Sequence, residues 1–228
     1  MCRAGHFACI GLVLAWLIAG SAVAADFDFL PANGAPYAVP VHSLQELRFR
    51  NTVKQQYDFS CGSAALATLL TYHYENRVDE ATVLGGMFEK GDQDKIRREG
   101  FSMLDMKRYL ADAGLSADGY RIDLSQLGNA GVPAIALLSR DGYRHFVVVK
   151  GISADRVLIG DPSRGTRTIS RDQFEQSQSG IFLVIRDRAD VARRHFNDWQ
   201  EWRASESIAL DQAVARPALE SRVATGMR

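Results

Sequence analysis

The spacing of apolar residues changes once along this chain, after Leu115. Before that point apolar side chains recur at the spacing of helices that bury one side, and after it they come in short β-branched runs separated by turn residues. The links between these runs are too short for the crossover that parallel neighbours need, so the strands should pair antiparallel. The pattern predicts an α+β fold, with N-terminal helices packed on an antiparallel β-sheet.

The helical half is predicted to contain three main segments, at 61–76, 79–91 and 101–114. Ser60, or Asp58 slightly earlier, is expected to cap the first segment, which puts Cys61 in its first turn. Ser102 and Asp105 are three residues apart and predict a capping box for the last segment. The expected inner face of that last helix consists of Leu104, Met106, Leu110 and Ala113.

The strand half is predicted to contain runs at 133–139, 143–151, 156–162, 164–170 and 181–187. If the two runs on either side of the turn SAD form a hairpin, His145 lies opposite a position near 162 or 163. Asp161 is then a near neighbour of His145. Whether the two side chains share a face depends on the register and on any bulge.

The start of the chain resembles a secretory signal peptide, at residues 1–25. Arg3 and His6 precede an apolar run, and small residues follow it, with cleavage expected after Ala24 or Ala25. The apolar run is short for a membrane span, which needs about 20 residues, so an uncleaved anchor is the less favoured alternative. The pattern predicts export and no membrane span in the mature chain.

A central region at 50–187 is flanked by two regions of different composition. Residues 26–49 contain several prolines and predict an extended lead-in. Residues 188–228 carry Trp199 and Trp202 and predict a helical or partly disordered tail. This tail could dock on the domain or on a partner, or it could have no specific role.

Composition narrows the chemistry that the chain can perform. The formal charge is zero, so nothing points to nucleic acid or to an anionic membrane as a partner. Phosphate-binding glycine motifs and paired-histidine metal motifs are missing, so no cofactor is expected. Once Cys2 and Cys9 leave with the signal, Cys61 is the single thiol, which excludes an intramolecular disulfide. It is then a buried inert thiol, an intermolecular bridge or a nucleophile.

Cys61, His145 and Asp161 together are suited to nucleophilic catalysis. A thiol in the first turn of a helix faces unpaired amide hydrogens, which favour the reactive thiolate. A base at the head of a strand can reach a helix terminus, and an acid beside it would orient the imidazole. Each residue also has an ordinary interpretation: inert packing for the cysteine, a surface histidine near a turn, and a turn-forming Asp-Pro pair.

An oxyanion hole would complete a site for acyl transfer. The backbone amide of Cys61 is one candidate donor. The side-chain amide of Gln55, six residues earlier, is a candidate for the second, and the adjacent Gln56 is its rival.

These residues occur in the combination typical of a known family. Gln55, Cys61-Gly62, the segments EGFSMLDMKRYLADAGL, GVPAIALL and HFVVVKG, and a following Asp-Pro resemble the C39 peptidases, which are papain-like and remove double-glycine leader peptides from exported peptides. The resemblance covers about residues 50–187 and implies a papain-like fold. It also implies these roles: Cys61 as nucleophile, His145 as general base, Asp161 as orienting acid and Gln55 in the oxyanion hole.

The chain departs from the familiar members of this family, which are N-terminal domains of ATP-driven exporters. It has no nucleotide-binding motif, and it is more similar to the stand-alone exported members found in bacterial functional-amyloid secretion systems. That resemblance implies a periplasmic peptidase that cleaves an exported polypeptide beside an outer-membrane exporter. Non-catalytic binding of a secretion substrate, and acyl transfer to an amine instead of water, are the alternatives.

Gly85-Gly86 follows Leu84 and looks like a double-glycine cleavage site within this chain. Self-processing is one interpretation of the pair. A tight helix end is the other.

Overall fold

The computed structural model describes residues 28–29, 37–38, 43–140 and 143–206. The chain divides into two units, Met1–His42 and Ser43–Arg228. In the described part of the first unit, strands β1 (Asp28–Phe29) and β2 (Tyr37–Ala38) pair antiparallel. The predicted signal peptide and the last part of the predicted tail lie outside the described residues.

The second unit begins with α1 (Leu44–Phe49), inside the region that was expected to be extended. Ser43 and Glu46 form a capping box at its start: the Ser43 hydroxyl accepts the Glu46 amide hydrogen at 3.1 Å, and the Ser43 amide donates to the Glu46 carboxylate at 2.8 Å. The expectation of an extended lead-in up to residue 49 is therefore wrong for α1, because this local cap starts a helix.

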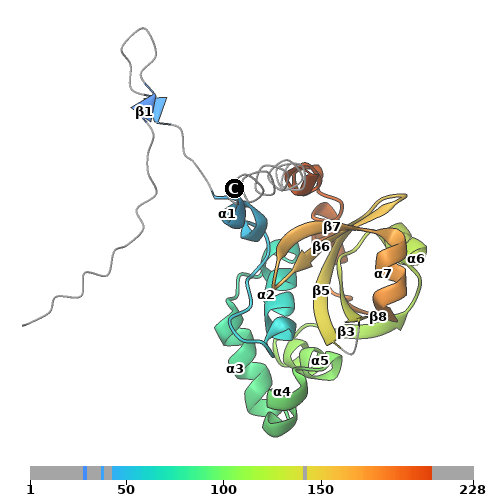
Figure 1. Ribbon diagram of the computed structural model, residues 1–228. Helices are drawn as coiled ribbons and strands as arrows, with labels where there is room; N and C mark the ends of the chain where they lie inside the picture. Colours follow the sequence, from blue (N-terminus) through green and yellow to red (C-terminus); the bar gives the residue numbers. More distant parts are fainter. Residues whose placement is uncertain (1–27, 30–36, 39–42, 141–142, 207–228) are drawn as a thin grey trace, which may run out of the picture. The chain divides into compact units, whose positions relative to one another are not determined.

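A layer of helices packs on one side of a six-stranded sheet (Figure 1). These helices are α2 (Cys61–His73), α3 (Glu80–Lys90), α4 (Gln93–Glu99) and α5 (Met103–Asp112). Helix α2 is buried on nearly all sides, which suits its run of alanine and leucine. Gly62 lets α5 come close to α2, because a β-carbon at this position would lie 2.9 Å from Met106 Cε. Phe101 Cβ would lie 3.0 Å from the same β-carbon, so the residue that follows Cys61 occupies a tightly packed position.

All six strands of the large sheet pair antiparallel, as the short links predicted. Their bounds are β3 (Ala117–Arg121), β4 (Ala134–Arg140), β5 (Tyr143–Ile152), β6 (Arg156–Asp161), β7 (Gly165–Ser170) and β8 (Gln178–Ile185). The order across the sheet is β3-β8-β4-β5-β6-β7, so β8, the last strand among the described residues, inserts between β3 and β4. The α+β prediction is confirmed.

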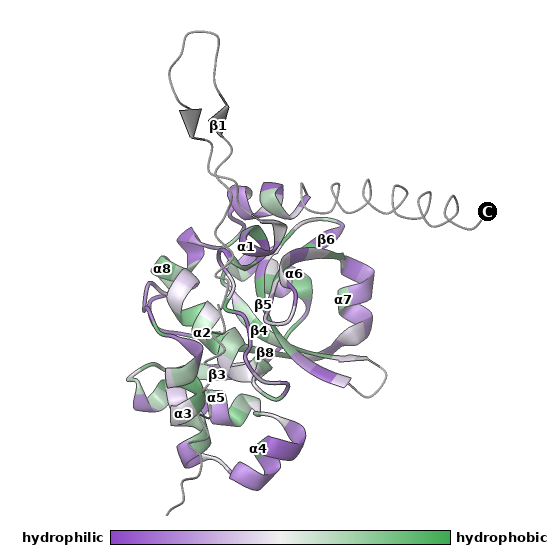
Figure 2. Ribbon diagram, turned by 60° about the vertical axis from the view of Figure 1, so that its left-hand side comes forward, coloured by the Kyte–Doolittle hydropathy of each residue, from purple (hydrophilic) through white to green (hydrophobic). Residues whose placement is uncertain are grey.

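The central strands contribute to two cores. Phe146 and Val148 of β5 pack with α2 and α5, whereas Val147 and Val149 pack with α6 (Leu124–Ala130) and α7 (Arg171–Ser177) on the opposite face. Figure 2 shows the hydrophobic colouring concentrated on α2 and the central strands, while α4 and α7 carry hydrophilic residues. This alternation fixes the register of β5, because a slip of one residue would exchange the two faces.

The sequence pattern missed β3, α4, α6 and α7. Helix α4 lies between the second and third predicted helical segments, where a charged connection was expected. Strand β3 is short and mostly exposed, so it lacks an apolar run. Helix α6 starts at a capping box formed by Asp123 and Gln126, and α7 starts at a cap by Ser170, but both helices are too short to show a clear period.

Helix α5 has the predicted capping box of Ser102 and Asp105 but not the whole predicted inner face. Met106 and Leu110 are buried, and they lie four residues apart on one side of the helix. Leu104 is 53% exposed because it is two residues away from Met106 and therefore on the other side. Ala113, at the C-cap, is exposed as well.

The described part of the C-terminal region packs against the sheet. It contains α8 (Ala189–Arg194) and a further helical stretch at 199–206. The Asn197 amide donates to the Lys150 carbonyl at 2.9 Å, and the Asn197 side chain accepts the Ile152 amide hydrogen at 2.8 Å. Glu201 forms an ion pair with Lys150, which is buried in β5. Residues 188–206 thus dock on the domain. Within the described ranges, no helix is both long and apolar enough to cross a membrane.

Candidate active site

Cys61 is the first residue of α2, as the sequence predicted, and it is 7% exposed. Ser60 stands at the N-cap but makes no side-chain cap bond to the helix, so the predicted capping role is wrong. Its hydroxyl is instead engaged with the preceding loop and with Glu80. The amide hydrogens of the first turn of α2 are therefore not satisfied by that side chain.

His145 and Asp161 meet across the hairpin of β5 and β6. The register places Val148 opposite Gly160 and Val149 opposite Ile159, which continues to a position near 162 or 163 for His145, as predicted. His145 Nε2 lies 2.7 Å from Asp161 Oδ1, and the two side chains are 9% and 2% exposed. The predicted neighbour of His145 is therefore its hydrogen-bond partner.

Asp161 is held at both carboxylate oxygens. Oδ1 accepts the Ser163 amide hydrogen at 3.0 Å and the Ser163 hydroxyl at 2.7 Å, in addition to its contact with His145. Oδ2 accepts two hydrogen bonds from the Arg167 guanidinium, at 3.1 and 3.0 Å. Burial alone would raise the pKa of Asp161, but His145, Ser163 and Arg167 outweigh it and lower the pKa. The carboxylate is ionised and fixed in orientation.

The environment of His145 favours the protonated ring. Burial by itself lowers the pKa of His145, but the hydrogen bond to Asp161 and the interaction with Cys61 overcome it and raise the pKa to about 9. The other ring nitrogen, Nδ1, is buried and has no hydrogen-bond partner among the described residues. Tyr143 stacks on the ring, with centroids 5.8 Å apart and planes at 21°. One nitrogen is thus committed to the acid, and the other is available for reaction.

Gln55 approaches this group through its backbone. Its amide donates to the Pro162 carbonyl at 3.0 Å, directly after Asp161, and its side-chain nitrogen donates to the Tyr57 carbonyl at 3.0 Å. The rival candidate, Gln56, is exposed, and its amide points to Glu80 instead. The backbone contact places Gln55 beside Pro162, the residue that follows Asp161.

Sequence reasoning missed several residues around the site, namely Ser163, Arg167, Tyr143 and Glu80. The position of Arg167 could have been predicted from the sequence. Asp161 pairs with Gly165 and Ile159 pairs with Arg167 in the next hairpin, so Arg167 is a diagonal neighbour of Asp161. Finding it needed only the register of that second hairpin.

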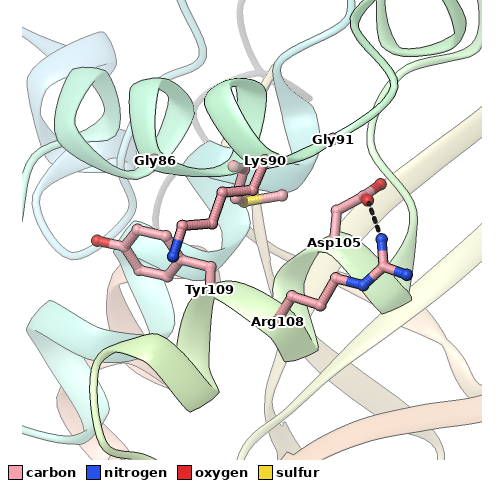
Figure 3. Close-up of a pocket in the computed structure, with 7 residues that line it drawn as sticks. Gly86, Lys90, Gly91, Asp105, Arg108 and Tyr109 are labelled. Atoms are coloured by element: carbon pink, nitrogen blue, oxygen red, sulfur yellow. Dashed lines mark ion pairs between the residues drawn. The ribbon is translucent and has the colours of Figure 1, made fainter.

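Gly85 and Gly86 lie within α3, so neither marks a tight helix end as the sequence suggested. A β-carbon at Gly86 would lie 2.8 Å from the Tyr109 ring, whereas one at Gly85 would meet nothing within 4 Å. Figure 3 shows Gly86 above Tyr109, with the ion pair of Asp105 and Arg108 at the other end of the pocket, near Gly91. The close approach of α3 and α5 explains Gly86 without self-processing. In the described part of the chain, no group of acidic, histidine and cysteine side chains could hold a metal ion.

A helix that begins with a buried cysteine, packed against an antiparallel sheet that carries a paired histidine and carboxylate, is the arrangement of a papain-like cysteine peptidase. The chain belongs to the peptidase C39 family, whose model matches residues 50–190, and it is a cysteine peptidase. The resemblance drawn from the sequence is confirmed.

Relatives and solved structures agree with this membership. The chain is 46% identical over 161 residues to "Probable functional amyloid protease FapD" of Pseudomonas fluorescens, covering 70% of this chain and 71% of that protein. It is 40% identical over 176 residues to the protein of the same name from Pseudomonas aeruginosa, covering 77% of each. The peptidase domain of Streptococcus ComA matches with a TM-score of 0.51 and 20% identity, over 59% of this chain and 96% of that one, and supports the fold.

Proposed function

We propose that this protein is a periplasmic cysteine peptidase that cleaves an exported polypeptide and supports the secretion of functional amyloid. Cys61 is the nucleophile, His145 the general acid and base, Asp161 the orienting acid and Gln55 the second donor of the oxyanion hole. The observation that carries the proposal is the 2.7 Å contact of His145 Nε2 with Asp161, which leaves the buried Nδ1 for the thiol at the start of α2.

The proposed reaction proceeds in two acyl-transfer steps. The Cys61 thiolate attacks the scissile carbonyl, and the amide of Cys61 and the side chain of Gln55 stabilise the oxyanion. His145 then gives its proton to the departing amine, which leaves a thioester on Cys61. Water, deprotonated by His145, attacks the thioester and releases the acid. Asp161 keeps the ring in one orientation through both steps.

The choice of substrate is supported by the named relatives and by the chain's own N-terminus. Two relatives that are at least 40% identical are described as probable functional amyloid proteases, and the first 25 residues resemble a secretory signal. A periplasmic enzyme of such a system would meet its substrate before or during passage through an outer-membrane exporter. An exported polypeptide that is still extended would fit a peptidase of this kind.

Replacing Cys61 in the native host tests the peptidase role. Strains carrying the wild-type protein and the Cys61→Ala variant are compared by mass spectrometry of their exported proteins. The proposal expects one exported protein to keep a larger mass in the variant strain, while circular dichroism of the purified variant matches the wild type. Unchanged masses for every exported protein would overturn the proposed processing role.

Location is tested separately. Fractionation should find the mature chain in the periplasm, and N-terminal sequencing should show that it starts directly after Ala24 or Ala25. A chain retained in the cytoplasm with residue 1 intact would contradict the proposed export.

A further inference from the structure

The loop between Gln55 and Ser60 forms hydrogen bonds with one buried carboxylate, that of Glu80. Glu80 is the first residue of α3 and is 3% exposed. Its two oxygens accept the Gln56 amide hydrogen at 3.2 and 3.1 Å, and Oε1 also accepts the Ser60 hydroxyl at 2.5 Å. In the described part of the chain, the hydrogen bonds to this carboxylate come from the loop.

A chain of contacts continues from Glu80 to the side chain of Gln55. Ser60 Oγ accepts the Tyr57 amide hydrogen at 3.1 Å, and the Ser60 amide donates back to the Tyr57 carbonyl at 3.1 Å. That same carbonyl accepts the side-chain nitrogen of Gln55 at 3.0 Å. The position of the Gln55 side-chain amide is thus set by the turn between Tyr57 and Ser60. Glu80 of α3 holds this turn through its hydrogen bond with Ser60.

The loop is also anchored at its other side. The backbone amide of Gln55 donates to the carbonyl of Pro162, the residue after Asp161. The backbone amide of Gln56 donates to Glu80. Two successive backbone amides are therefore held by two different parts of the fold, the turn that follows β6 and helix α3. An amide nitrogen of glutamine carries two hydrogens, so Gln55 can keep its bond to Tyr57 and still donate to an oxyanion.

Burial of this carboxylate has a cost that the loop contacts offset. Burying a carboxyl group is unfavourable unless hydrogen bonds satisfy it, and the Gln56 backbone amide and the Ser60 hydroxyl supply those bonds to Glu80. The loop is the part of the molecule that needs an acceptor there, since the Gln56 amide would otherwise be left unpaired.

We propose that Glu80 is a positioning residue for the oxyanion hole, which acts through the loop 55–60 on the side chain of Gln55. The inference rests on the role proposed for Gln55. It predicts that loss of Glu80 impairs attack on a carbonyl and spares the nucleophilicity of Cys61, because the pair of His145 and Asp161 lies on other elements.

Two small probes separate these effects without knowledge of the natural substrate. With p-nitrophenyl acetate, a bond forms between Cys61 Sγ and the acetyl carbon, the bond to oxygen breaks and p-nitrophenolate leaves, through an oxyanion. With iodoacetamide, Sγ displaces iodide directly and no oxyanion forms. The ratio of the acylation and alkylation rate constants, each corrected with Cys61→Ala, therefore reports the oxyanion hole.

For Glu80→Gln we expect this ratio to fall about tenfold, short of the roughly 10²-fold fall for Gln55→Ala, because the donor is displaced but still present. Glu89→Gln, on the exposed side of the same helix, should leave the ratio unchanged. Ser60→Ala removes the hydroxyl link only and should give a smaller fall. It keeps the test valid if Glu80→Gln does not fold, as judged by circular dichroism.

The outcomes distinguish this inference from the proposed function. A wild-type ratio for both Glu80→Gln and Ser60→Ala, with a lowered ratio for Gln55→Ala, would overturn the inference and leave the function intact. An equal fall in both rate constants would also overturn it, since it would indicate a general structural role. If wild type and Cys61→Ala react alike with both probes, the proposed nucleophile itself is wrong.

Discussion

Strand β5 carries two buried basic side chains, His145 and Lys150, and each is paired with a carboxylate from another element. His145 meets Asp161 of β6, and Lys150 meets Glu201 of the C-terminal region. His145 keeps one buried nitrogen without a described partner, whereas Lys150 also donates to the Asn51 carbonyl at 2.8 Å. We call His145 and Asp161 the open pair, because one ring nitrogen remains for the Cys61 thiol. We call Lys150 and Glu201 the enclosed pair, because the ammonium has a second partner.

The two pairs differ in the sign of their pKa shifts as well. The partners of His145 overcome burial and raise its pKa to about 9, so the ring is charged at neutral pH. For Lys150, burial dominates over Glu201 and lowers its pKa. A buried ion pair therefore does not by itself mark an active site. Under the proposed function, the open nitrogen and the interaction with the Cys61 thiol make the first pair the reactive one.

The largest effect is expected from breaking the open pair. Asp161→Asn removes the charge that orients His145 and stabilises its protonated ring, so the rate of Cys61 acylation should fall by about 10⁴-fold, as expected when the tautomer is no longer fixed. The pKa of His145 should also drop from about 9, and the alkaline limb of the pH–rate profile should move down with it. Acylation by p-nitrophenyl acetate over a pH series measures both. A variant with the wild-type profile would show that Asp161 does not orient the ring.

Breaking the enclosed pair should lower the free energy of unfolding and leave the reactivity of Cys61 unchanged. Glu201→Gln leaves Lys150 buried without its counter-charge, and removing one partner of such a pair typically costs about 3–5 kcal/mol of unfolding free energy. Denaturant unfolding measures the loss, and Cys61 alkylation in the folded variant should stay at the wild-type rate. The double variant Lys150→Met with Glu201→Leu should recover most of the stability. A double variant as unstable as Glu201→Gln would contradict this explanation.

The two pairs also show what the sequence could reveal. His145 and Asp161 lie on strands joined by a short turn, so the register of that hairpin is enough to predict that they are neighbours. Lys150 and Glu201 are far apart in sequence and join elements whose packing no local pattern encodes. The helical layer and the antiparallel sheet followed from residue spacing. Four elements were missed because they are short or mostly exposed and show no clear apolar period: β3, α4, α6 and α7. The contacts of Glu80 with the loop are likewise long-range and carry no local signal.

A smaller effect on the acylation rate should follow from removing the hydrogen bonds that Arg167 gives to Asp161. Arg167 donates two hydrogen bonds to Asp161 Oδ2 and is 32% exposed, so water can replace it in part. Arg167→Gln should therefore slow acylation by about tenfold, the size expected for hydrogen bonds to a charged group after partial screening. Arg167→Lys should recover part of the rate. Arg164→Gln removes a neighbouring exposed charge and serves as the control. Equal falls in acylation rate for Arg167→Gln and Arg164→Gln would show that the loss of positive charge, and not of the hydrogen bonds to Asp161, causes the effect.

The smallest effect is on the pH dependence of stability, where the two pairs should act in opposite directions. The folded pKa of His145 is raised from 6.5 to about 9, so its contribution is fully present below pH 6.5 and is lost as the pH rises through about 9. The slope from this one group is at most about 1.4 kcal/mol per pH unit. Lys150 has a lowered folded pKa, so the cost of burying its charge is relieved as the pH rises toward 10.5.

Denaturant unfolding between pH 6 and 9.5 separates the two contributions. His145→Gln should remove the decline in stability with rising pH, relative to the wild type, because the variant has no group there that holds an extra proton in the folded state. Lys150→Met, made together with Glu201→Leu, should steepen the decline at the alkaline end, because the opposing contribution is gone. If His145→Gln leaves the slope unchanged, the ring is not charged in the folded protein, and the contrast between the open and the enclosed pair loses its electrostatic basis.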